Sequence, residues 1–367
     1  MSFVGFAAFE AEDATLAAAT TRRAFAGKDD ALSRACKSCG KKDATTRLRG
    51  LASLAERASS VDARELALVA AWWAESGVAR SALGDDDARV REAAAKALEA
   101  CAAAGAPLRR FEGELAGPWW AATADGAPEV ARAAVAAWRA AFPKNGGVAG
   151  AARNRAAILD FLGAALASDD DAARSRALGA AGKLVDAARS TGVDDRFREL
   201  LRAFAAQPAT FKALKGGSGD VLERRACYGL LARLAAQAPD ACALDGGGKK
   251  VGGGALALLA AEAEEPSNAA ALWEALAAVA AVERCVDEAA AKAAKSGSLE
   301  GRLAQAVRKA AKDRQVARAV AERAPAVARA APRLAEALAA ALRDACVAAD
   351  HASAGSLGAV SYTHLRA

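Results

Sequence analysis

Apolar positions recur along this chain with the period of an α-helix. From Val90 onward, one apolar stripe is formed by Val90, Ala94, Ala97, Leu98 and Cys101. The same offsets forty residues later select Val130, Ala134, Ala137, Trp138 and Ala141. Charged residues occupy the positions between, so the pattern predicts an amphipathic helix in each place.

Short acidic or turn-forming segments precede these helices and recur further along the chain. They include Asp86, Glu129, Asp171, Glu223 and Asn268 and are spaced by roughly 42 to 52 residues. That spacing is in or near the length of HEAT and armadillo helix pairs, about 40–47 residues. First helices of the pairs are expected at 61–76, 107–123 and 151–167. Because one pair cannot bury its apolar face alone, we expect an all-α solenoid, a curved stack of antiparallel helix pairs.

Composition supports this fold and excludes several classes of protein. Hydrophobic residues make up 54% of the 367 positions, which is too many for a disordered chain. Close to a third of the residues are alanine, the best helix former, and aromatic residues are 5%, so few strands are expected. No apolar run is long enough to span a bilayer and no secretion signal is seen, so we expect a cytosolic protein without membrane contact.

Four regions differ in pattern. Residues 1–40 show little repeat, 41–295 carry the HEAT-like repeats, 296–350 form a charged helical continuation, and 351–367 are an expected disordered or non-native tail. The last seven residues resemble translated read-through, and we therefore expect the chain to be a truncated fragment.

Cysteine and tryptophan have structural interpretations. Cys36 and Cys39 are the only pair at metal or redox spacing, and no second pair supplies the other two ligands of a structural zinc. We therefore favour two helix-end cysteines. The six tryptophans lie inside helical patterns, so packing between repeats is favoured over a binding platform.

Positive charge is concentrated in two places, although the net charge is only +6. Residues 22–57 carry ten Lys and Arg against four acidic residues, and residues 292–323 carry nine against three. Concentrated cations suit an RNA- or phosphate-facing surface. The alternative, that these side chains only solvate helix faces, stays open for both stretches and is favoured for 292–323.

Catalytic chemistry has little support. The two histidines, His351 and His364, lie far from any Ser, Cys or Asp pattern that would make a triad or a metal site. The glycine-lysine segment 246–254 lacks the phosphate-loop pattern and follows no strand. We expect this chain to bind partners, with no catalytic residue, metal or cofactor of its own.

Several segments together resemble the listerin family of RING-type E3 ubiquitin ligases. The most specific is Gly40-Lys-Lys-Asp-Ala-Thr-Thr-Arg-Leu-Arg-Gly-Leu51, which is similar to the family's Lys-Lys-Asp-x-Thr-Thr element. The other segments follow in family order: Gly5-Phe6, Asp87–Ala93, Trp119, Ala136–Pro143 and Ala271–Ala275.

The resemblance implies a cytosolic HEAT-repeat region that docks on the large ribosomal subunit during ribosome-associated quality control. It implies contacts with rRNA, with ribosomal protein and with the tRNA-binding factor that adds tails to stalled chains. The resemblance implies a C-terminal RING that binds zinc and recruits the ubiquitin-charged E2. This chain lacks that RING, so we expect ligase activity only of the full-length protein.

Six residues are transferred from the matching element as ribosome- or partner-facing: Lys41, Lys42, Thr45, Thr46, Arg47 and Arg49. Phosphate contacts by the cations and hydroxyl contacts by the threonines would position the protein without reading sequence. The alternative function is a generic HEAT scaffold for proteins, such as a segment of a transport receptor or of a translation regulator.

Overall fold

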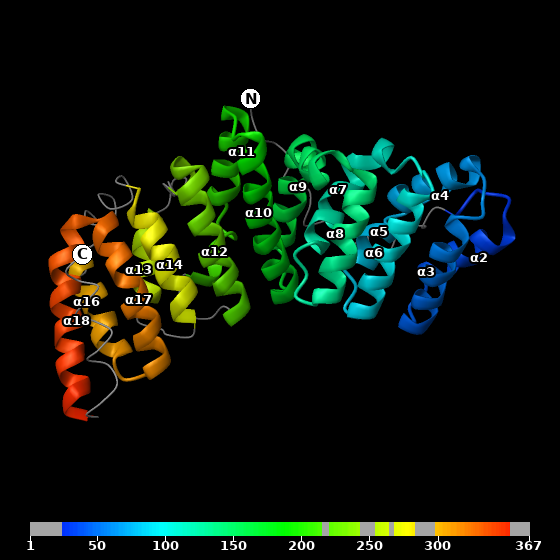
Figure 1. The fold of residues 1–367 in the computed structure, drawn as a ribbon. Helices are drawn as coiled ribbons and strands as arrows, with labels where there is room; N and C mark the ends of the chain where they lie inside the picture. Colours follow the sequence, from blue (N-terminus) through cyan, green and yellow to red (C-terminus); the bar gives the residue numbers. More distant parts are fainter. Residues whose placement is uncertain (1–23, 215–219, 243–253, 264–267, 283–297, 353–367) are drawn as a thin grey trace. The chain divides into compact units, whose positions relative to one another are not determined.

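The computed structural model describes residues 24–214, 220–242, 254–263, 268–282 and 298–352. All regular structure in this part of the chain is helical (Figure 1). The predicted all-α, helical-repeat class is therefore confirmed. The chain divides into two compact units, Met1–Ile158 and Leu159–Ala367, called unit 1 and unit 2.

Unit 1 is built from helix pairs joined by short turns. The second helices α3, α6 and α8 pack side by side in chain order. Helix α5 packs on α6, α7 packs on α8, and α4 packs on α5 and α7. The helices are α2 (Asp30–Cys39), α3 (Ala44–Ala58), α4 (Ala63–Glu75), α5 (Val78–Leu83), α6 (Ala88–Ala103), α7 (Glu112–Ala122), α8 (Pro128–Ala141) and α9 (Val148–Leu166), whose last turns enter unit 2.

Unit 2 repeats the plan. Helices α10, α12, α14 and α17 form the successive second helices, and α16 packs against α18. The helices are α10 (Asp171–Thr191), α11 (Asp195–Ala206), α12 (Val221–Gln237), α13 (Gly254–Glu262), α14 (Ala269–Ala280), α16 (Leu299–Ala310), α17 (Arg314–Ala330) and α18 (Pro332–Ala352). No described helix is both long and apolar enough to cross a bilayer.

Aspartates start most of the second helices. The side chains of Asp87, Asp170 and Asp220 each accept a hydrogen bond from a backbone N–H of the first helical turn. This satisfies donors that have no partner inside the helix and places negative charge at its positive end. Helix α8 lacks such a cap and begins instead with Pro128, whose fixed φ suits the first turn. The predicted helix starts at these four positions are confirmed.

Tryptophan and alanine fill the core. All six tryptophans are at most 7% exposed. Trp138 contacts Trp119, Trp120 and Phe142, with centroid distances of 4.4–5.6 Å. Buried alanines such as Ala94 and Ala134 let neighbouring second helices approach closely. The prediction that the tryptophans are packing residues is confirmed.

The structure shows a helix in the N-terminal segment, where the sequence pattern predicts little repeat. Within residues 1–40, α2 packs its buried residues Leu32, Ala35, Cys36 and Cys39 against α3 and so completes the first pair. The charged continuation is helical from Leu299 onward and packs on α13 and α14. Residues 353–367 and the Gly5-Phe6 element lie outside the described residues.

Candidate functional site

The basic segment singled out in the sequence forms the turn between α2 and α3. Gly40, Lys41 and Lys42 lead from α2 to Asp43, which caps α3. Lys41 and Lys42 are both exposed. Within the part of the chain that the structure describes, neither ammonium group has an ion-pair partner.

Two further candidates, Thr45 and Arg49, lie on α3 and are exposed. Residues four apart on a helix share one face. These two side chains therefore extend the exposed surface of the turn along α3. Four of the six candidate residues, Lys41, Lys42, Thr45 and Arg49, therefore lie at the surface.

The guanidinium of Arg47 binds other residues of the chain. Its side chain is 19% exposed, its Nε lies 2.8 Å from Oδ2 of Asp85, and its Nη2 donates to Oδ1 of the same carboxylate at 3.0 Å. Its Nη1 donates to the carbonyl oxygens of Lys41, at 3.2 Å, and Lys42. The guanidinium therefore ties the basic turn to the turn before α6. Arg47 was expected to face outward, but its guanidinium points to Asp85 instead. Hydrogen bonds between two charged groups are stronger than those between neutral ones.

Thr46 is half-buried and belongs to the cap of α3. Its backbone N and its Oγ1 both donate to Oδ2 of Asp43, each at 2.7 Å. These hydrogen bonds, led by that from the hydroxyl, lower the pKa of Asp43 below its ordinary value. The cap is thus most effective when Asp43 is ionised, and its contribution to stability is lost as the pH falls through that lowered pKa.

Replacing Thr46 with valine should raise the pKa of Asp43 toward its ordinary value, because the strongest hydrogen bond to the carboxylate is removed while the backbone donors remain. A pH titration of the Asp43 carboxyl ¹³C shift by NMR measures this. Thr45→Val, which removes an exposed hydroxyl one residue away, should leave that pKa unchanged. An Asp43 pKa that is equal in Thr46→Val and the parent chain contradicts this account of the cap.

A second arginine repeats the arrangement one helix pair later. Arg91 donates from Nε and Nη2 to the carboxylate of Asp125, at 2.7 and 2.9 Å. Its Nη1 donates to the carbonyl oxygens of Asp85 and Asp86, at 2.7 and 3.1 Å. Like Arg47, Arg91 is the fourth residue of its helix. It binds the turn before its own helix and the turn before the next second helix, α8.

Unit 2 contains the same device. Arg174, the fourth residue of α10, donates to the carbonyl oxygen of Ser168 at 2.8 Å and to both carboxylate oxygens of Glu223. The pattern of apolar and charged positions does not single out these arginines. Each of them is the fourth residue of its helix. Each donates to the carbonyl oxygen of the residue six positions earlier, in the turn before that helix.

A polar groove of about 240 Å³ lies where the α2–α3 turn meets the turn before α6. It brings part of the candidate site together with residues from the next repeat. Its lining consists of Cys39, Gly40, Lys41, Lys42, Arg47, Ser81, Gly84, Asp85 and Asp86. Thr45, Thr46 and Arg49 do not line it.

The second basic stretch is partly neutralised by ion pairs. Arg308 pairs with Asp344 at 3.0 Å, and Glu322 pairs with Arg318 and Arg323 at 2.9 and 3.2 Å. Its first residues, 292–297, lie outside the described part. Ion pairs of this kind are typical of solvated helix faces, which is the interpretation that the sequence favours for this stretch.

Among the described residues, Cys36, Cys39, Cys101, Cys227 and Cys242 are free, buried thiols. Cys36 and Cys39 are buried thiols in α2, as the helix-end interpretation predicts. Burial raises the pKa of Cys39 and of Cys101 to about 12, which disfavours the reactive thiolate. Among the described residues, no group of three or more His, Cys, Asp or Glu side chains could hold a metal ion.

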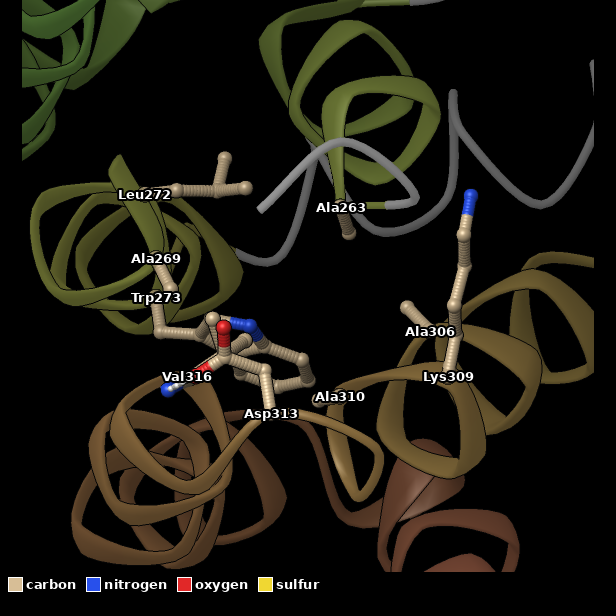
Figure 2. Close-up of a pocket in the computed structure, with 9 residues that line it drawn as sticks. All are labelled: Ala263, Ala269, Leu272, Trp273, Ala306, Lys309, Ala310, Asp313 and Val316. Carbon is tan, nitrogen blue, oxygen red and sulfur yellow. Dashed lines mark hydrogen bonds between the residues drawn. The ribbon is translucent and has the colours of Figure 1, made fainter. Parts of the chain in front are cut away.

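A second, smaller cavity lies in unit 2 between α14, α16 and α17 (Figure 2). Trp273 and several alanines line it, together with the charged residues Lys309 and Asp313. Asp313 is already engaged as the cap of α17, since its Oδ1 accepts from the backbone N of Val316 at 3.1 Å. The volume of about 30 Å³ has room for one or two water molecules.

Comparison with known proteins assigns the family. Residues 28–317 match the family model of the N-terminal domain of the E3 ubiquitin-protein ligase listerin. No curated protein matches the chain.

Two engineered proteins solved by the Northeast Structural Genomics Consortium are similar to it, each at 17% identity. The match to the first covers 85% of this chain and 98% of the engineered chain, with a TM-score of 0.34. The match to the second covers 92% of this chain and 98% of the engineered chain, with a TM-score of 0.27. Because the family model spans well over half of the sequence, this chain belongs to the listerin family and carries its N-terminal domain.

Proposed function

We propose that this chain is the ribosome-docking region of a listerin-like E3 ubiquitin ligase that acts on stalled nascent chains in the cytosol. The docking surface is the corner formed by Lys41, Lys42, Thr45 and Arg49. The observation that carries the proposal is the exposure of these side chains on a turn whose backbone is held by Arg47. The listerin-family assignment supports the choice of the large ribosomal subunit as partner.

A fixed turn favours docking for a physical reason. Binding must immobilise side chains and loops at the interface, and a backbone that is already ordered lowers this entropic cost. Arg47 binds the carbonyl oxygens of both lysines and so holds their Cα atoms in place without using their ammonium groups. The cations remain available to attract an anionic ribonucleoprotein surface.

The chemistry of ubiquitin transfer lies elsewhere in this proposal. The ubiquitin-charged E2 would be recruited by the zinc-dependent RING of the ligase, a part that these residues do not contain. The role of the helical repeats is to place that part on the obstructed subunit, next to the tRNA-binding factor that adds tails. No catalytic step is assigned to any residue of this chain.

Reversing the two lysines tests the proposal. The Lys41→Glu, Lys42→Glu double variant should bind purified large ribosomal subunits about tenfold or more weakly, because two attractive contacts become repulsive. Binding is measured by co-sedimentation over a range of subunit concentrations at fixed salt. Neither side chain forms an ion pair among the described residues, so the thermal unfolding midpoint should change little.

A matched control carries the same change in charge on another helix. Arg132 and Arg139 are exposed on α8, and Arg132→Glu, Arg139→Glu should leave subunit binding within about twofold, since exposed charges distant from an interface are largely screened. If the lysine and arginine variants bind equally well, the corner is not the docking surface. Binding of the parent chain to other proteins but not to subunits would favour the generic scaffold.

A further inference from the structure

The groove beside the basic turn carries charges of both signs. Arg47 and Asp85 pair with each other in it and neutralise one another. Lys41 and Lys42 lie on its α2–α3 side and Asp86 on the side of the next repeat, and both sides are exposed. Among the residues that the structure describes, the side chains of Lys41, Lys42 and Asp86 have no hydrogen-bond or ion-pair partner.

This arrangement is a poor match for a nucleic-acid backbone. A phosphate chain presents negative charge only, so a strand seated on the two lysines would bring a phosphate toward Asp86. Like charges placed side by side at an interface cost free energy and suppress the wrong partner. A protein segment has no such conflict, because it can offer an acidic side chain to the lysines and a basic one to Asp86.

The size of the groove agrees with a protein segment. Pockets that enclose a whole small molecule are about 300–1,000 Å³, and this groove is about 240 Å³. It suits one or two side chains that project from a neighbouring surface. Thr45 and Arg49 lie outside the groove on the exposed face of α3, so a contact with RNA there would not involve Asp86.

We infer that the groove between the α2–α3 turn and the turn before α6 binds a protein segment that carries an acidic side chain next to a basic one. The acidic side chain pairs with Lys41 or Lys42, and the basic side chain pairs with Asp86. This inference rests on the proposed docking function and names the chemical class of the partner at one part of that surface.

The sign of an Asp86→Lys effect separates a protein partner from RNA. With a protein segment in the groove, the full-length 367-residue chain carrying Asp86→Lys should bind purified large ribosomal subunits about fivefold or more weakly, because an ion pair becomes a repulsion. With phosphates in the groove, the added cation should tighten binding. Co-sedimentation with intact subunits, and with protein-free rRNA extracted from the same subunits, measures both cases.

The outcomes are distinguishable from failure of the docking proposal. Glu129→Lys, the same change at an exposed position of α8, is the control and should have no effect. Tighter or unchanged binding by Asp86→Lys, together with weaker binding by the Lys41→Glu, Lys42→Glu variant, overturns the inference and leaves docking in place. Unchanged binding by the double lysine variant overturns docking itself. Thermal unfolding of each variant confirms that the chain is folded, since Asp86 contributes no side-chain hydrogen bond among the described residues.

Discussion

Replacing Asp125 with alanine should lower the free energy of unfolding of unit 1 by about 3–5 kcal/mol, because it leaves the buried guanidinium of Arg91 without its counter-charge. The side chains of Asp125 and Arg91 are 0% and 10% exposed, and the carboxylate also accepts a hydrogen bond from the backbone N of Ala127 at 2.9 Å. Urea unfolding followed by tryptophan fluorescence reports on this unit, since five of the six tryptophans lie in it.

Two variants check that the cause is the uncompensated charge. Asp86→Ala, at an exposed position of the preceding turn, should change the free energy of unfolding by less than about 0.5 kcal/mol. The double variant Asp125→Leu, Arg91→Met should recover part of the loss, because it removes both charges and restores apolar volume. An Asp125→Ala loss no larger than that of Asp86→Ala contradicts a stabilising role for the pair.

Replacing Trp138 with alanine should destabilise the same unit by about 3–5 kcal/mol. The indole is 2% exposed and contacts the rings of Trp119, Trp120 and Phe142 at centroid distances of 5.6, 5.2 and 4.4 Å. Its Nε1 also donates to the carbonyl oxygen of Gly147 at 2.9 Å. The substitution opens a large cavity and removes this hydrogen bond, and urea unfolding followed by far-ultraviolet circular dichroism measures the loss.

Trp138→Phe separates packing from hydrogen bonding. It keeps an aromatic ring in the cluster but loses the indole donor, so the loss should be smaller, about 1–2 kcal/mol. The near-ultraviolet circular dichroism of Trp138→Ala should also fall, because the neighbouring indoles lose a rigid partner. Equal losses for the two variants would mean that the aromatic packing contributes little.

Local signals were sufficient for most of the fold. Helices α6 and α8 follow from the apolar stripes that begin at Val90 and Val130, and Asp87 and Pro128 mark their starts. Helix α2 was missed although its buried residues have helical spacing from Leu32 to Cys39. This apolar stripe covers only one short helix, at the edge of a segment without a repeat pattern. No neighbouring stripe at the repeat spacing was therefore available for comparison.

The candidate site was predictable only in part, because charge in a sequence does not say which cations are paired. Lys41, Lys42 and Arg49 are exposed, whereas Arg47, in the same short segment, binds Asp85. Its partner is 38 residues away and is brought close by the packing of α3 on α6. Such a pairing depends on tertiary structure, and so does the groove that places Asp86 opposite the lysines.

Electron cryomicroscopy of this chain bound to purified large ribosomal subunits tests the docking proposal most directly. We expect the α2–α3 turn and the exposed face of α3 to lie against the subunit, with Lys41, Lys42 and Arg49 in contact with it. A complex in which another surface of the chain makes every contact, and residues 40–49 face solvent, would contradict it.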